Sequence, residues 1–171
     1  SSSDKNIYII DFGLARRFVD SRTGQVRPAR SVAGFRGTVR YASIGSHEQR
    51  ELGPHDDMWC VFYSLVEFAT GSLPWMRMRD KTQVLALKKQ YNNESLVRSL
   101  PPEFGQFMRH LQTLSYAQLP DYKYLKELLM SICVAKQFKL EDPYDWELPH
   151  LRRKSTTTAT AATMATTTNN N

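Results

Sequence analysis

The chain has 171 residues, which is enough for one domain with a sizeable core but not for two. Hydrophobic residues make up 41% of it and aromatic residues 11%, a composition typical of globular proteins that excludes a wholly disordered chain. The formal net charge of +6 favours anionic partners, although the charges are scattered and a merely solvated basic surface is the plainer alternative. No apolar run is long enough to cross a membrane, so no membrane partner is expected.

An apolar run near the start of the chain, Ile7–Ile10, ends at the tripeptide Asp11–Gly13. The run predicts a short strand over residues 6–10 that enters a functional turn. The Asp11 carboxylate supplies the hard oxygen that Mg²⁺ prefers when it bridges nucleotide phosphates. Phe12 is bulky enough to anchor the turn in a core. We therefore interpret Asp11 as a candidate metal ligand, while an Asp that only caps a turn is the structural alternative.

A long loop and a central helix are predicted next. Residues 14–46 contain several glycines and arginines with little periodicity, which indicates one long ordered loop of the kind that usually carries function. Asp56 and Asp57 favour a helix start, because the free backbone N–H groups there attract negative charge. The segment Met58–Thr70 is apolar nearly all round and predicts a helix at the centre of the core, ended by Gly71.

Three amphipathic helices are predicted further along the chain. They cover Lys81–Tyr91, Glu103–Leu114 and Tyr122–Gln137. The composition then becomes rich in Thr, Ala and Asn, which cannot bury enough apolar surface to offset the entropy of ordering. We therefore expect a mainly α fold in one domain over residues 1–148, followed by a disordered tail over residues 149–171.

The cysteines, histidines and basic residues indicate the cellular compartment and the kinds of ligand to expect. Cys60 and Cys133 both lie in apolar helical patterns, as reduced core thiols do in cytoplasmic or nuclear proteins. The four histidines share no spacing that suggests a metal site. No basic run is interleaved with aromatic residues, so a nucleic-acid partner is not expected.

Four motifs follow one another in a recognisable order. Asp11–Gly13 is followed by Gly-Thr-Val-Arg-Tyr-Ala-Ser at 37–43, by Asp-Met-Trp-Cys at 57–60 and by Gly-Ser-Leu-Pro-Trp at 71–75. This order and spacing resemble the large-lobe half of a protein kinase. Most kinases have Ala-Pro-Glu shortly after the Tyr of the second motif, whereas Ala-Ser-Ile-Gly stands here, which resembles the casein kinase I group.

Within that group, the stretch Val32–Ser43 and the tripeptide His55–Asp57 resemble the tau-tubulin kinase branch. The resemblance covers about residues 5–148. It implies the C-terminal, large lobe of a protein kinase-like α+β fold. The implied activity is transfer of the ATP γ-phosphate to Ser or Thr of a protein substrate.

The resemblance also implies roles for single residues. Asp11 matches the Mg²⁺ ligand, Ile10 matches the floor of the adenine pocket, and Phe12 matches a ring that stacks inside the lobe. For Ile10, a place in the core alone is the alternative. Thr38 matches a hydroxyl that bonds the catalytic Asp and Lys of the preceding catalytic loop. Asp57 matches a carboxylate that caps backbone N–H groups of that same loop.

Arg40, Gly71 and Arg79 match an anion pocket that grips a phosphate or an acidic group on the substrate. Family members often carry Lys where Arg79 stands, and Arg would add bidentate donor geometry. Acidic or already phosphorylated proteins, cytoskeletal ones among them, are therefore the implied substrates. The alternative is that the two arginines only pair with local carboxylates.

Several kinase motifs have no counterpart in this sequence. It holds no glycine-rich loop with its Lys, no helix C Glu and no His-Arg-Asp-type catalytic loop. We therefore expect a fragment or a processed product that lacks the N-lobe and the catalytic loop and is inactive alone. The alternative is a non-catalytic module that binds acidic or phosphorylated segments through Arg36, Arg40 and Arg79.

Overall fold

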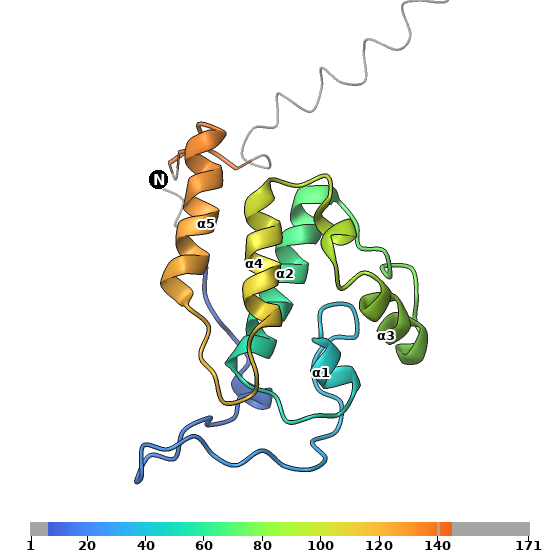
Figure 1. The fold of residues 1–171 in the computed structure, drawn as a ribbon, viewed down its shortest axis with the longest axis vertical. Helices are drawn as coiled ribbons and strands as arrows, with labels where there is room; N and C mark the ends of the chain where they lie inside the picture. Colours follow the sequence, from blue (N-terminus) through green and yellow to red (C-terminus); the bar gives the residue numbers. More distant parts are fainter. Residues whose placement is uncertain (1–6, 140, 145–171) are drawn as a thin grey trace, which may run out of the picture. The chain divides into compact units, whose positions relative to one another are not determined.

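The computed structural model describes residues 7–139 and 141–144, and the chain divides into two compact units, residues 1–132 and 133–171. The described residues are mainly helical, as the sequence predicts, and contain no β-strand beyond an isolated bridge between Val19 and Val26 (Figure 1). The α-helices are α1 (Ile44–His47), α2 (Pro54–Thr70), α3 (Lys81–Gln90), α4 (Pro102–Gln112) and α5 (Tyr122–Ala135), with 3₁₀ helices η1 (Phe12–Leu14) and η2 (Glu94–Val97).

The central helix α2 has well-defined ends. At its start, the Asp56 Oδ2 atom accepts a hydrogen bond of 2.9 Å from the Gly53 N–H. At its end, Gly71 adopts a left-handed conformation with φ of 77°, and its N–H donates to the Glu67 carbonyl at 2.7 Å. A residue with a Cβ rarely adopts this conformation, which is why glycine stands there.

The core forms between α2 and α4, which lie side by side in Figure 1. Phe62 of α2 is fully buried and stacks on Phe107 of α4, with ring centroids 5.4 Å apart. Such aromatic pairs add to the stabilisation from burial alone. The predicted helices over 81–91, 103–114 and 122–137 are confirmed to within two residues at each end. Their buried apolar positions are Val84, Phe104, Phe107, Met108, Leu111, Leu125 and Leu128.

One face of α2 is not buried, contrary to the prediction of a helix enclosed nearly all round. Phe68 is 81% exposed and Val61 43% exposed, and both lie away from the buried face of Trp59, Phe62 and Val66. Cys60, predicted as a core thiol, is only partly buried. An exposed apolar helix face marks a surface suited to further contacts.

The predicted strand over residues 6–10 is wrong for its described part, Ile7–Ile10, which is irregular. A strand needs a neighbour for its backbone hydrogen bonds, and none exists among the residues described. Ile10 is 79% exposed, and Phe12 is 71% exposed rather than anchored in the core. The prediction that these residues are buried rested on their hydrophobicity alone, and the described residues do not cover them.

The described part of the second unit is short. It comprises the end of α5 and a turn in which the Gln137 N–H donates to the Val134 carbonyl at 3.0 Å. The predicted domain end at residue 148 and the predicted tail over 149–171 lie outside the described residues. Within the described part of the chain, no helix is long and apolar enough to cross a membrane.

Candidate functional site

Asp11 has an uncommon backbone conformation. Its φ of 60° and ψ of 77° place it in the left-handed region, and its Oδ1 atom accepts a hydrogen bond of 3.1 Å from the Gly13 N–H. A Cβ at position 13 would lie 3.1 Å from that same oxygen, so glycine is favoured there. Asp tolerates the left-handed region better than most residues, but the conformation still costs energy and often marks a functional turn.

The Asp11 carboxylate is exposed, and as a hard oxygen donor it fits one position in a Mg²⁺ coordination sphere. The residues that the structure describes hold no group of three or more acidic, His or Cys ligands. Asp11 thus fits as one ligand, and the other donors would have to come from nucleotide, water and groups outside the described residues.

Ile10 and Phe12 flank Asp11 but do not form a pocket with it. Both side chains are largely exposed. The structure therefore places these two candidate residues next to Asp11, and their contacts with a nucleotide stay a prediction. An exposed ring at position 12 is available to pack against another part of a lobe.

A tight turn over residues 37–42 carries Thr38 and Arg40. The Thr38 carbonyl accepts hydrogen bonds from the N–H groups of Tyr41 and Ala42, at 2.9 and 2.8 Å. Thr38 itself is exposed and lies at a hollow of about 410 Å³ on the outward face of α2. The hollow is lined by Thr38, Tyr41, Ala42, Cys60, Val61, Ser64, Leu65 and Phe68.

The two adjacent carboxylates at the start of α2 differ sharply. Asp56 is buried and accepts hydrogen bonds from the Ser43 hydroxyl at 2.6 Å and from the Gly53 N–H at 2.9 Å. Asp57 is exposed and accepts no hydrogen bond from any residue described. The pKa of Asp57 is raised mainly because part of its carboxyl group is shielded from water, and to a smaller extent because the Asp56 carboxylate is close by. Asp56 thus stabilises the helix start, whereas Asp57 is left available for groups outside the described residues.

Two members of the predicted anion pocket meet at Glu67. The Arg40 guanidinium lies 3.1 Å from Glu67 Oε1, and the Gly71 N–H donates to the Glu67 carbonyl. Arg40 therefore pairs with a local carboxylate, and its place in an anion pocket stays a prediction. Arg79 is exposed and forms no ion pair within the described ranges. The other oxygen of Glu67, Oε2, is buried without a hydrogen-bond partner among the described residues.

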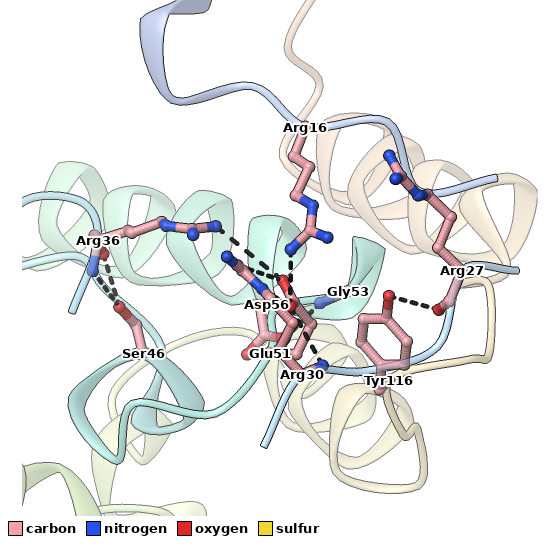
Figure 2. Close-up of polar contacts among 9 residues, drawn as sticks. All are labelled: Arg16, Arg27, Arg30, Arg36, Ser46, Glu51, Gly53, Asp56 and Tyr116. Atoms are coloured by element: carbon pink, nitrogen blue, oxygen red, sulfur yellow. Dashed lines mark hydrogen bonds and ion pairs between the residues drawn. The ribbon is translucent and has the colours of Figure 1, made fainter. Parts of the chain in front are cut away.

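The long loop is held by a buried carboxylate that the sequence reasoning missed (Figure 2). Arg30 binds both oxygens of Glu51, with its Nη2 atom 3.0 Å from Oε1, and Arg16 lies 2.8 Å from Oε2. Arg36 approaches Oε1 at 4.0 Å. The hydrogen bond from Arg30, together with the nearby guanidinium charges, lowers the pKa of Glu51 to about 2.

Two further contacts fasten the same loop. The Ser46 hydroxyl donates to the Arg36 carbonyl at 2.6 Å, and the Tyr116 hydroxyl donates to the Arg27 carbonyl at 2.9 Å (Figure 2). The loop is thus ordered by side chains from α1, from the segment before α2 and from the segment after α4. The only signal in the sequence was an excess of arginines in a loop that precedes an acidic residue.

Comparison with known proteins finds relatives among protein kinases. The chain is 51% identical over 147 residues to a probable serine/threonine-protein kinase of Dictyostelium discoideum, across 85% of this chain and 30% of that protein. No protein-family model matches the sequence. The fold is that of the large lobe of a protein kinase-like domain, and the similarity supports a segment of a protein kinase. The chain spans less than a third of the length of that relative.

Proposed function

We propose that this chain is the large-lobe part of a Ser/Thr protein kinase of the casein kinase I group, tau-tubulin kinase branch. The complete protein would transfer the ATP γ-phosphate to a protein hydroxyl. The observation that carries the proposal is the left-handed, exposed Asp11 in a chain that shares 51% of its aligned residues with a probable Ser/Thr kinase. A free thiol at each cysteine suits a reducing compartment such as the cytoplasm or the nucleus.

In this proposal Asp11 holds Mg²⁺, which neutralises phosphate charge when it is bound with ATP. Ile10 and Phe12 contribute apolar surface next to the nucleotide and to the rest of the domain. The exposed hydroxyl of Thr38 and the unpaired carboxylate of Asp57 face groups that the described residues do not include. Their exposure supports a role in holding a catalytic loop, because the hydroxyl can donate and the carboxylate can accept hydrogen bonds from another segment.

Acidic or phosphorylated protein segments are the proposed substrates, cytoskeletal proteins among them. Arg79 is exposed and carries no ion pair within the described residues, and Arg40 is 39% exposed beside the Gly71 turn. Both guanidiniums can reach an anionic group from solution. Because Glu67 already holds Arg40, an incoming anion has to compete with this carboxylate.

This chain alone is proposed to be inactive. Phosphoryl transfer needs a base or orienting Asp, a Lys that clamps the phosphates and a full set of Mg²⁺ ligands held together. Asp11 is one ligand of that set, and the described residues hold no cluster that would complete it. The second candidate function is a non-catalytic module for acidic or phosphorylated segments, favoured by the exposed Arg79 and the partly exposed Arg36 and Arg40.

Phosphotransfer measurements separate the two candidates. The purified 171-residue chain and a longer product of the same gene that carries a catalytic loop are each incubated with labelled ATP, Mg²⁺ and an acidic protein. The kinase proposal predicts transfer by the longer product only, abolished by Asp11→Asn and retained by the control Asp20→Asn. A longer product without transfer that still binds acidic peptides would establish the binding module instead.

A further inference from the structure

Lys88 on α3 is an unusual lysine, because it is only 1% exposed. Lysine side chains are almost never buried to this degree unless they are paired with an opposite charge. Within the described ranges, however, Lys88 forms no ion pair with a carboxylate. Its burial also leaves no path by which a substrate could reach it as a nucleophile. Burial of an ammonium group without an opposite charge is unfavourable, so other contacts of Lys88 have to compensate for the lost hydration.

The Lys88 ammonium instead binds backbone carbonyls of the turn over residues 37–42. The Nζ atom donates to the Val39 carbonyl at 3.0 Å and also to the Ala42 carbonyl. It lies 4.8 Å from the ring centre of Tyr63 and 5.3 Å from that of Trp75. The electron-rich faces of these rings stabilise an ammonium group that is no longer hydrated.

Other side chains hold the same stretch of backbone. The Trp75 Nε1–H donates to the Arg40 carbonyl at 2.8 Å, and His47 Nε2 lies 3.2 Å from the Val39 carbonyl. Three carbonyls of one short turn are therefore bound by side chains from α1, from α3 and from the segment that follows α2. Such a set of contacts fixes the backbone far more firmly than a surface turn requires.

The carbonyls are held from the core, while the turn keeps its functional side chains accessible. Thr38 is exposed, and the Arg40 side chain is 39% exposed. We propose that Lys88 is a positioning residue, which fixes the backbone of residues 37–42 and thereby sets the direction in which Thr38 and Arg40 meet the substrate. The part of this inference that concerns substrate rests on the proposed kinase function.

The protonation state of Lys88 does not undo this role. Desolvation lowers the pKa of Lys88 to about 7, and the facing groups are Cys60 and Tyr63 of α2 and His47 of α1. An ammonium has three N–H donors and a neutral amine still has two. Two donors are enough for the two carbonyls, so the turn stays bound on both sides of neutral pH.

Hydrogen exchange on the 171-residue chain tests the positioning directly. Lys88→Met keeps the apolar stem and removes every donor, while Lys89→Met removes a neighbouring lysine that is exposed and bound to Glu48. We expect Lys88→Met to speed the exchange of the Tyr41 and Ala42 amides about tenfold or more, with α2 and α4 unchanged. Lys89→Met should leave all of these rates unchanged. Unchanged turn amides, or equal acceleration throughout the core, would overturn the proposal.

If Lys88→Met does not fold, the unmodified chain decides the question by amine acylation. Lys88 should resist the reagent under conditions in which Lys89 reacts, and the protection should end when the turn is loosened by Trp75→Phe, which removes the donor to the Arg40 carbonyl and makes the ring that faces Lys88 smaller. Acylation of Lys88 at the rate of Lys89, or protection that survives Trp75→Phe, would overturn the inference.

In the longer kinase product, Lys88→Met should raise the KM for an acidic peptide about tenfold while the KM for ATP stays the same. Lys89→Met should change neither value. An equal loss in both substrates, or a fall in kcat alone, would contradict positioning of the substrate turn. Absence of any transfer by the unmodified longer product would overturn the proposed function, and the exchange experiment would still judge the role of Lys88.

Discussion

The helical core and the N-terminal segment of this chain use apolar residues in opposite ways. In α2 and α4, Phe62 and Phe107 are almost wholly buried and stack on each other. In residues 7–14, Ile10 and Phe12 are largely exposed, although the residue types are the same. The α2–α4 core is closely packed within the described residues, whereas the turn over residues 11–13 presents apolar surface that is open to further contacts.

The proposed kinase function accounts for this contrast. A large-lobe segment has its own helical core, but its nucleotide-binding edge is completed by another part of the domain. Asp11, Thr38 and Asp57 all lie on surfaces where the described residues supply few partners. The loop between these two regions is nevertheless well ordered. Glu51 forms ion pairs with its arginines, and Lys88 donates hydrogen bonds to its backbone carbonyls.

The largest expected difference comes from truncating one phenylalanine in each region. Phe62→Ala should lower the free energy of unfolding by about 3–5 kcal/mol, because it leaves a cavity in a closely packed core. Phe12→Ala should change it by less than about 0.5 kcal/mol, because its ring is already exposed. Urea denaturation of the 171-residue chain measures both. Similar losses for the two variants would show that Phe12 is packed as closely as Phe62.

A smaller effect is expected where the loop meets the core. Glu51→Gln removes a carboxylate that binds Arg16 and Arg30, and should lower the free energy of unfolding by about 2 kcal/mol. Because the pKa of Glu51 is lowered to about 2 from 4.5, its contribution is present above pH 4.5 and is lost as the pH falls toward 2. The difference between Glu51→Gln and the unmodified chain should shrink over that interval.

Glu94→Gln is the matched control for Glu51, since Glu94 also pairs with an arginine, Arg109, but is 75% exposed. Its effect on the free energy of unfolding should stay below about 0.5 kcal/mol at every pH. If Glu51→Gln and Glu94→Gln lower the free energy of unfolding equally, the buried carboxylate does not order the loop.

A pH effect of about 1 kcal/mol is expected at Lys88. Its pKa is lowered to about 7 in the folded state, so the unfolded chain binds more protons between pH 7 and 10.5. Stability relative to Lys88→Met should therefore rise with pH, by up to about 1.4 kcal/mol per unit. Denaturation at pH 7 and pH 8 measures the slope, and Lys89→Met should show none. A flat or falling difference would contradict a desolvated lysine at this position.

The smallest effect concerns ligand binding at the loop. Glu67→Gln removes the charge that holds Arg40, so a phosphorylated acidic peptide should bind about threefold to tenfold more tightly, as expected for loss of one partly exposed ion pair. Fluorescence polarisation measures the affinity. Glu127→Gln on α5, whose side chain is 64% exposed, should leave it unchanged. Weaker binding after Glu67→Gln would show that this carboxylate supports the pocket rather than competing for it.

The sequence predicted the helices well because each carries its own pattern. The apolar stripe of α4 and the carboxylates at the start of α2 are local signals, and both helices lie where they were expected. The strand over residues 6–10 was wrong because a strand is defined by a partner, and hydrophobic residues do not say whether a partner is present.

The polar contacts of the site could not be predicted, because they join distant parts of the chain. Arg16 meets Glu51 across 35 residues, and Lys88 reaches Ala42 across 46. No spacing in the sequence predicts such pairs. The position of Lys88 in its helix would suit an exposed lysine equally well, so its burial could not be predicted. The left-handed conformation of Asp11 was equally hidden, since Asp adopts it only in particular turns.

Binding of magnesium–nucleotide is the most direct test of the central claim that Asp11 is a kinase metal ligand which needs donors beyond this chain. Calorimetric titration compares the 171-residue chain with the longer gene product, with and without Mg²⁺. We expect no binding by the shorter chain, and Mg²⁺-dependent binding by the longer one that Asp11→Asn weakens about tenfold or more. Equal binding by both chains, or an Asp11→Asn variant that keeps its magnesium dependence, would contradict it.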